Sequence, residues 1–215
     1  MRILVLAKAP VVGRVKTRLC PPLTASQAAE VAAAALHDTL AAADASGADE
    51  RFLALDGAPG PWLPAGWTVV AQRGTTFAER LSAAWADCAG PTLQIGMDTP
   101  QLTAARMDSA MDRLLAQHCI LGPATDGGWW GLGLRSSQPG TFDGVPMSTD
   151  RTCIEQIRRL RELGLNPEML EPLTDVDTWA DAVAVAGAAP GTSFADLVTR
   201  LDRVTAPAES SGGPR

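Results

Sequence analysis

Four basic side chains stand in one short segment without an acidic residue, AKAPVVGRVKTRL at residues 7–19. It contains both lysines of the chain, Lys8 and Lys16, together with Arg14 and Arg18. An ammonium group acts as a point charge on phosphate, whereas a guanidinium can hold two oxygens. Gly13 lets backbone N–H groups approach an anion. The segment therefore predicts a di- or triphosphate site; the alternative is a solvated loop whose charges only aid solubility.

The segment has the sequence position of a phosphate-binding loop. It follows the apolar run 2–6 and precedes a helix, although it matches neither GxxxxGK[ST] nor GxGxxG. A weaker candidate is the arginine of QRGTTFAERL. We assign nucleotide binding to Ala7, Lys8, Pro10, Gly13, Arg14, Lys16, Thr17, Arg18 and Arg80.

Two acidic motifs are candidates for a divalent cation. GMDTP places Asp98 at the end of an apolar strand, and DVDTWAD places Asp175 and Asp177 on one face if that segment is extended. Mg²⁺ or Mn²⁺ needs only one or two carboxylates when substrate phosphates supply further oxygens. We assign Asp98 and Asp177 as metal ligands. In the alternative, Asp98 caps a helix or turn, and Asp177 or Thr178 caps the following helix.

A glycine-rich turn, GPATDGGWWGLGL, predicts a wall for a second substrate. Glycines permit close approach of a ligand, and an aromatic face can stack on a ring. Adjacent strand residues point to opposite faces, so we expect at most one of Trp129 and Trp130 to line the site. In the alternative, both tryptophans are simply packed in a hairpin. The acceptor-binding candidates are Asp126, Gly127, Gly128, Trp129, Ser148 and Thr149, and the catalytic ones are Lys16, Arg18, Asp98 and Asp126.

Apolar periodicity predicts elements that bring these motifs together. Short apolar runs predict strands at 2–6, 51–55 and 68–72, before GMDTP, and on either side of the glycine-rich turn. Helices are expected from about Thr24 to Ser46, at 76–88, at 103–116 and at 154–165, the last with Ile154, Ile157, Leu160 and Leu163 on one face. The segment EMLEPLTDVDTWADAV predicts a short strand, a turn and a helix.

Alternating strands and helices predict a three-layer α/β/α sandwich with a mostly parallel central sheet. Ligands bind at the carboxyl ends of such strands, where the basic segment and Asp98 both fall. We expect one domain at 1–203 and a disordered tail at 204–215, which lacks apolar spacing.

Composition excludes several classes of partner. The net charge of −6 leaves no broad basic face for nucleic acid or for an anionic membrane. The apolar start, MRILVLAKAP, is shorter than a signal segment or a membrane span, so we expect a cytoplasmic protein. Cys20, Cys88, Cys119 and Cys153 show no zinc-ligand spacing and are interpreted as reduced, structural residues. A homodimer is left open.

Taken in order, AKAPVVGRVKTRL, QRGTTFAERL, GMDTPQL, GPATDGGWWGLGL and DVDTWAD resemble a bacterial family of GT-A-type transferases, domain of unknown function family 2064, named for radical-SAM/selenodomain association. The resemblance covers residues 1 to about 185, and the opening loop is similar to that of 2-phospholactate guanylyltransferases. It implies a nucleotide-diphospho-sugar transferase (GT-A) fold, with the nucleotide over the first strand and a divalent ion at Asp98.

By the same resemblance, the basic segment is the nucleotide loop, residues 126–128 are the acceptor-side turn, and Asp177 is the late aspartate. Met97 stands where a small residue is usual, and Trp129 and Trp130 stand where tyrosines are common. These differences concern the identity of the acceptor more than metal binding.

Three functions agree with these motifs. The leading one is glycosyl transfer from a nucleotide sugar to a small acceptor, with Mg²⁺ or Mn²⁺ and the loop cations stabilising the diphosphate leaving group. The second is nucleotidyl transfer with release of pyrophosphate, because four cations are generous for a diphosphate. The third is a nucleotide-binding module without turnover.

Overall fold

The computed structural model describes residues 1–205, and its centre is a seven-stranded sheet in the order β3-β2-β1-β4-β6-β5-β7. The strands are β1 (Arg2–Lys8), β2 (Glu50–Asp56), β3 (Thr68–Ala71), β4 (Thr92–Gly96), β5 (Cys119–Pro123), β6 (Trp129–Leu134) and β7 (Glu168–Met169). Only β6 runs antiparallel to its neighbours. The carboxyl ends of the parallel strands therefore meet at one edge of the sheet, and the site is built there.

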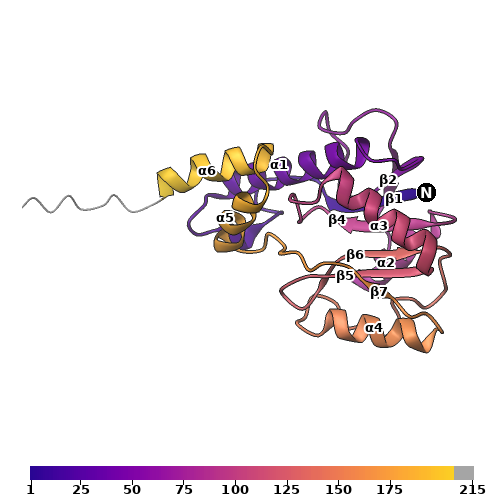
Figure 1. Ribbon diagram of the computed structural model, residues 1–215. Helices are drawn as coiled ribbons and strands as arrows, with labels where there is room; N and C mark the ends of the chain where they lie inside the picture. The colour runs from indigo at the N-terminus through magenta and orange to yellow at the C-terminus, as the bar shows by residue number, and fades with distance from the viewer. Residues whose placement is uncertain (206–215) are drawn as a thin grey trace, which may run out of the picture.

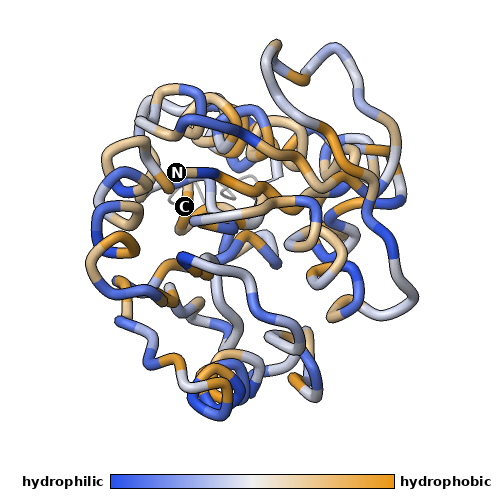
Figure 2. The backbone as a smooth tube through the Cα atoms, turned by 90° about the vertical axis from the view of Figure 1, so that its right-hand side faces the viewer, coloured by the Kyte–Doolittle hydropathy of each residue, from blue (hydrophilic) through white to orange (hydrophobic). Residues whose placement is uncertain are grey.

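Helices cover both faces of the sheet (Figure 1). One apolar cluster joins the sheet to α1 (Ala25–Asp44) and α3 (Ala104–Gln117), and a second joins it to α2 (Phe77–Ala86) and α4 (Thr152–Glu162). The apolar strand segments run through the middle of the molecule (Figure 2). Two layers of helices around a mostly parallel sheet confirm the predicted three-layer α/β/α sandwich.

A third apolar cluster lies beyond the sheet. There α5 (Trp179–Ala188) and α6 (Ser193–Thr205) pack against α1 and the short 3₁₀ helix η1 (Thr17–Leu19) (Figure 1). Leu19 and Val176 are both fully buried in this cluster. The chain on either side of these residues carries the basic segment and the DVD motif, so the packing brings the two together.

Side-chain caps fix where several helices begin. Thr24 accepts a hydrogen bond from the backbone of Gln27, whose side chain accepts in return from Thr24; the same capping box opens α2 at Thr76 and α5 at Thr178. Thr103 caps α3. Asp98 therefore caps no helix, and Thr178 rather than Asp177 is the cap of α5.

Three expectations differ from the structure. Ile154 is largely exposed, because the buried face of α4 carries Thr152, Gln156 and Leu160 instead. The helix α6 was not predicted from the sequence, and its apolar side chains pack on α1 and α5. This helix continues through Val204 to Thr205, so the predicted tail does not begin at residue 204; the rest of it, 206–215, lies outside the described residues.

The cysteines and the helix lengths bear on two further expectations. All four cysteines are free, and burial raises the pKa of the Cys88 and Cys119 thiols to about 12, which keeps both as unreactive thiols. Within residues 1–205, no helix combines the length and the apolar composition needed to cross a membrane.

Candidate functional site

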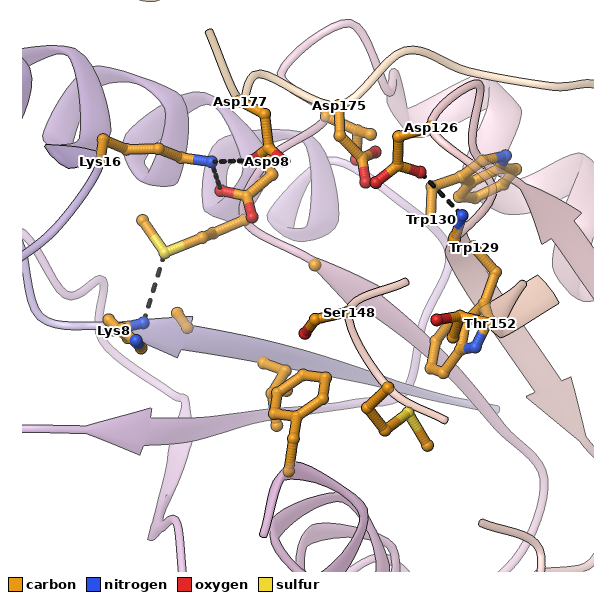
Figure 3. A pocket seen from close by; sticks show the side chains of 18 of the residues that line it. Lys8, Lys16, Asp98, Asp126, Trp129, Trp130, Ser148, Thr152, Asp175 and Asp177 are labelled. Atoms are coloured by element: carbon orange, nitrogen blue, oxygen red, sulfur yellow. Dashed lines mark hydrogen bonds and ion pairs between the residues drawn. The ribbon is translucent and has the colours of Figure 1, made fainter. Parts of the chain in front are cut away.

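A cavity of about 650 Å³ opens at the edge of the sheet where β1, β4 and β5 end (Figure 3). Its lining includes most of the predicted site residues: Ala7, Lys8, Arg14, Lys16, Thr17, Arg18, Asp98, Asp126, Gly128, Trp129, Ser148, Thr149 and Asp177. Motifs that are up to 170 residues apart in the chain thus line one cavity, as expected for residues at the carboxyl ends of parallel strands.

Lys16 links the basic segment to the acidic residues. Its Nζ lies 2.6 Å from Asp98 Oδ1 and 3.6 Å from Asp177 Oδ1, and it donates to the carbonyl of Val176. Only 10% of the side chain is exposed. The residue adopts a left-handed backbone conformation, φ 49°, directly before η1. A strained backbone that delivers a buried ammonium to two carboxylates is typical of a functional site.

The other three cations of the segment differ in their partners. Arg18 lies 3.2 Å from the Asp177 carboxylate, on the opposite oxygen from Lys16. Lys8 and Arg14 line the cavity, and within residues 1–205 neither side chain has an ion-pair partner. Two cations are therefore compensated by aspartates, and two remain available to an anion in the cavity.

Asp175 is the most perturbed acid of the site. Burial, as the largest cause, and the nearby carboxylates of Asp98 and Asp126 together raise its pKa to about 7, although Lys16 lowers it in part. Its Oδ1 is buried and, among the described residues, has no hydrogen-bond partner. An unpartnered carboxyl oxygen among other carboxylates is an unfavourable arrangement unless a cation or a proton joins it.

The donor set suits a hard divalent cation. Asp98, Asp175 and Asp177 all line the cavity and offer only oxygen ligands, which Mg²⁺ and Mn²⁺ prefer. In the described part of the chain, no three acidic, histidine or cysteine side chains are grouped closely enough to form a complete metal site. The ammonium of Lys16 stands between Asp98 and Asp177. The residues fit a cation that also takes ligands from a bound substrate.

The glycine-rich turn aims Asp126 into the cavity. Its Oδ1 accepts a hydrogen bond from the backbone N–H of Gly128 at 2.8 Å. Gly127 has φ 91°, and a Cβ there would overlap the carbonyl oxygen of Asp150. The backbone N–H of Cys153 also bonds the Gly127 carbonyl at 2.8 Å. Gly127 therefore holds the turn against the 147–153 segment rather than lining the cavity itself.

Both tryptophans line the cavity, which corrects the expectation that at most one would. They do pack into the two different apolar clusters, Trp130 on the α1 side and Trp129 on the α2 side. Trp130 donates its indole N–H to the carbonyl of Glu171, and Trp129 stacks on Phe142. The cavity lies at the start of β6, where a ligand can reach both faces of the strand.

The two hydroxyl residues at 148 and 149 are both exposed but differ in their hydrogen bonds. The Thr149 side chain bonds the backbone at the start of α4, accepting from the N–H of Arg151. Ser148 is exposed, has φ 60°, and its hydroxyl points into the cavity (Figure 3). Ser148 is thus the hydroxyl that is free to meet a ligand.

Four predicted residues do not line the cavity: Pro10, Gly13, Gly127 and Arg80. Gly13 has φ 75° and open space around it. A glycine therefore suits this position because of the backbone conformation of the turn, and not because a side chain would clash. Arg80 lies 3.4 Å from the Asp56 carboxylate at the end of β2. The half-buried Arg80 of α2 is therefore held by Asp56 at the carboxyl end of β2, outside the cavity lining.

Sequence reasoning did not assign two glutamines that line the cavity, Gln72 and Gln94. Gln72 donates its amide to the carbonyls of Ala7 and Ala54. Gln94 lies in the middle of the central strand β4 and is only 2% exposed. A polar residue inside an apolar strand, as in PTLQIG, was the signal that could have identified Gln94.

Comparisons with known proteins agree with this architecture. Residues 25–149 match the model of the family described as uncharacterized protein conserved in bacteria (DUF2064). No curated protein matches the chain. A solved structure from Desulfovibrio desulfuricans G20, provisionally named a nucleotide-diphospho-sugar transferase, has a TM-score of 0.85 at 24% identity, covering 95% of this chain and 96% of that one.

Two further solved structures share the fold less closely. Rv0371c from Mycobacterium tuberculosis H37Rv, solved as a manganese complex, has a TM-score of 0.52 at 22% identity over 86% of this chain and 96% of that one. CMP:2-keto-3-deoxy-manno-octonic acid synthetase, complexed with CTP, has a TM-score of 0.52 at 14% identity over 83% and 93%. These likenesses establish the nucleotide-diphospho-sugar transferase fold.

Proposed function

The chain belongs to the bacterial DUF2064 family, and from that premise we propose that it is a metal-dependent transferase that uses a nucleotide-activated donor. Our first candidate reaction is glycosyl transfer from a nucleotide sugar to a small acceptor. The name of the Desulfovibrio structure supports this choice. The observation that carries the proposal is one cavity in which the basic segment faces a group of aspartates.

The donor's phosphates would lie between these two groups. Lys8 and Arg14 line the cavity without ion-pair partners in the described chain, so they are the cations that would hold phosphate oxygens. Lys16 would move from Asp98 towards the phosphates when a divalent ion arrives, since both cations compete for the same carboxylate. Arg18 would keep Asp177 in place.

A Mg²⁺ or Mn²⁺ ion on Asp98 and Asp177, with Asp175 as a further ligand, would supply Lewis-acid stabilisation of the departing diphosphate. The manganese complex of the Mycobacterium structure supports the choice of a divalent ion. The unpartnered buried oxygen of Asp175 is the reason for including this residue.

The remaining groups would handle the acceptor. Asp126, oriented by the Gly128 N–H, is the candidate base that takes the proton from the acceptor hydroxyl. That oxygen then bonds to the anomeric carbon as the bond to the nucleoside diphosphate breaks. The charged loop stabilises the leaving group at the same moment. Ser148 and Trp129 would position the acceptor.

The second candidate reaction is nucleotidyl transfer. In it the same acceptor oxygen attacks the α-phosphorus of a nucleoside triphosphate, and pyrophosphate leaves. Two unpaired cations in addition to a metal ion suit a triphosphate, and the neighbour complexed with CTP supports this reaction. A nucleotide-binding module without turnover is the third candidate.

Product analysis separates these candidates. We would incubate the protein with Mn²⁺ and either GDP- and UDP-sugars or the four nucleoside triphosphates, with a panel of small hydroxyl acceptors, and measure free nucleoside diphosphate and pyrophosphate separately. Nucleoside diphosphate without pyrophosphate supports glycosyl transfer, and pyrophosphate alone supports nucleotidyl transfer. Metal-dependent binding with neither product would refute the proposed transferase activity.

A further inference from the structure

Gln94 is a buried amide whose orientation is fixed by its partner. The indole N–H of Trp85 donates to Gln94 Oε1 at 2.6 Å. An indole N–H can only donate, so the atom facing it must be the amide oxygen. The Nε2 end, with its two donors, therefore points away from Trp85.

The other end of this amide faces the cavity. Gln94 is among the lining residues although it is only 2% exposed, and no side chain or backbone group in residues 1–205 accepts from its Nε2. Buried polar groups in native proteins are nearly always hydrogen-bonded. Gln94 Nε2 is not among the fully shielded unpaired atoms of the described residues, so it opens into the cavity, where a bound ligand can accept from it.

The surroundings of Gln94 are apolar. We define the α2-side chamber as the part of the cavity lined by Leu6, Phe77, Gln94, Trp129, Met147 and Thr152. Leu6, Trp129 and Met147 belong to the apolar cluster under α2 and α4. Trp129 and Thr152 lie on the side of the cavity away from Lys16 (Figure 3).

The chamber residues include no charged side chain. Every basic residue of the cavity comes from the 8–18 segment, and the nearest in sequence, Lys8, lies beyond Leu6 at the end of β1. An anionic group beside Gln94 would therefore have no counter-ion among the chamber residues. The hydroxyl of Thr152 is already engaged, donating to the carbonyl of Pro146 at 2.7 Å. Gln94 Nε2 and the indole N–H of Trp129, which has no hydrogen-bond partner among the described residues, are thus the donors of the chamber residues that are not already engaged.

We propose that the α2-side chamber is the acceptor subsite, and that Gln94 selects an uncharged acceptor with an apolar or aromatic body and a carbonyl oxygen. This oxygen accepts from Gln94 Nε2, the body packs on Phe77 and Trp129, and the acceptor hydroxyl faces Asp126. Calling the bound molecule an acceptor rests on the proposed transferase function. The binding preference itself is independent of turnover.

Three probes of similar size test the preference by calorimetry on the full chain: 4-hydroxyacetophenone, 4-ethylphenol without the carbonyl, and 4-hydroxybenzoate with a charge. We expect the ketone to bind about tenfold more tightly than 4-ethylphenol, the usual effect of one hydrogen bond to a buried donor. The benzoate should bind most weakly. Equal affinities for the ketone and 4-ethylphenol, or no binding of either, would overturn the proposal.

Variants of Gln94 test whether this residue causes the preference for the ketone. Gln94→Leu should remove the tenfold preference for the ketone and leave the affinity for 4-ethylphenol unchanged. Because this change leaves the Trp85 indole unpaired, the Trp85→Phe/Gln94→Leu double variant removes both ends of the buried bond and serves if the single variant is unstable. A preference that survives in either folded variant contradicts the assignment.

The affinity of each variant for Mn²⁺ with CTP and with GTP is measured on the same samples. A Gln94-dependent probe preference without nucleotide binding would support the chamber and refute the transferase proposal. Nucleotide binding together with a preference that does not depend on Gln94 would refute the chamber alone.

Discussion

The cationic and acidic walls of the cavity are built in different ways. The cationic wall is one continuous segment that contains Lys8, Arg14, Lys16 and Arg18. The acidic wall is assembled from the end of β4 at Asp98, the β5–β6 turn at Asp126, and the extended chain before α5 at Asp175 and Asp177. The first wall depends on local sequence, whereas the second exists only when the sheet and the α1–α5–α6 cluster have formed.

The two walls contact each other directly. Lys16 and Arg18 pair with the acidic wall, and the backbone N–H of Val176 donates to the Asp98 carbonyl at 2.9 Å. Lys8 and Arg14 take part in no ion pair in the described chain. The four cations therefore have two different roles. Lys16 and Arg18 hold the acidic wall together, and Lys8 and Arg14 are available to bind an anion.

The largest effect is expected when the acidic wall loses its central carboxylate. Asp98→Asn should lower metal-dependent turnover by at least about 100-fold, because a metal ion contributes several kcal/mol of charge stabilisation in the transition state. The measurement is product formation against Mn²⁺ concentration, with thermal unfolding as the control for folding. Unchanged metal dependence would exclude Asp98 as a ligand, and gross loss of structure would indicate a structural role.

The next largest effect should come from the two unpaired cations. The double change Lys8→Ala/Arg14→Ala should weaken nucleotide binding by about 100-fold, since each charge-assisted contact is worth roughly 1.5–3 kcal/mol. Folding stability should not change, because neither side chain has an ion-pair partner in the described chain. Calorimetry with GDP and GTP checks this, and Arg106→Ala on the exposed face of α3 is the matched control.

Replacement of Lys16 is expected to have two smaller effects in opposite directions, one on nucleotide binding and one on Mn²⁺ binding. Lys16→Ala should weaken nucleotide binding about tenfold, the loss of one phosphate contact. The same change should strengthen the binding of Mn²⁺ alone, because Asp98 and Asp177 lose the ammonium that neutralises them. Electron paramagnetic resonance of free Mn²⁺ measures the second effect without turnover. Weaker Mn²⁺ binding in the variant would contradict the competition between Lys16 and the metal.

A further effect concerns the pH dependence of stability in the absence of metal. The pKa of Asp175 is about 7 in the folded protein and about 4 in an unfolded chain, so the folded state holds this proton more tightly. Its stabilising contribution is complete below pH 4 and is lost as the pH rises from about 4 to about 7. Asp175→Asn should therefore gain stability relative to the wild type between pH 5 and pH 8.

Urea unfolding at pH 5 and at pH 8 measures this difference. The matched control is Asp112→Asn, an exposed aspartate on α3 that faces away from the cavity. An Asp175→Asn variant whose stability follows the wild type at both pH values would show that Asp175 is not held protonated by its surroundings.

Much of the fold and part of the site could be predicted from local patterns. Apolar runs located the main strands, and the Thr-x-x-Gln, Thr-x-x-Glu and Thr-x-x-Asp caps mark the helix starts at Thr24, Thr76 and Thr178. The buried face of α4 was predicted wrongly, because the apolar stripe that includes Ile154 leaves this residue exposed. Sequence spacing gives a helical face, but only packing decides which face turns inward.

Site residues without a charge pattern could not be predicted. Gln72 carries no motif, and the only sequence signal of Gln94 is its polar side chain inside the apolar strand PTLQIG. The role of each glutamine depends on the neighbours of its amide, which are Ala7 and Ala54 for Gln72 and Trp85 for Gln94. Arg80 was included for its charge, yet Asp56 holds it outside the cavity lining. A cytoplasmic location and a homodimer stay predictions.

The sequence alone determined the fold class and the basic segment, because strand periodicity and a run of like charges are properties of neighbouring residues. Only the tertiary structure decided which charges are free: the α1–α5–α6 packing brings Val176 beside Asp98 and so gives Lys16 and Arg18 their acidic partners. Electrostatic pairing depends on distance in space and on burial, and neither is a property of order along the chain.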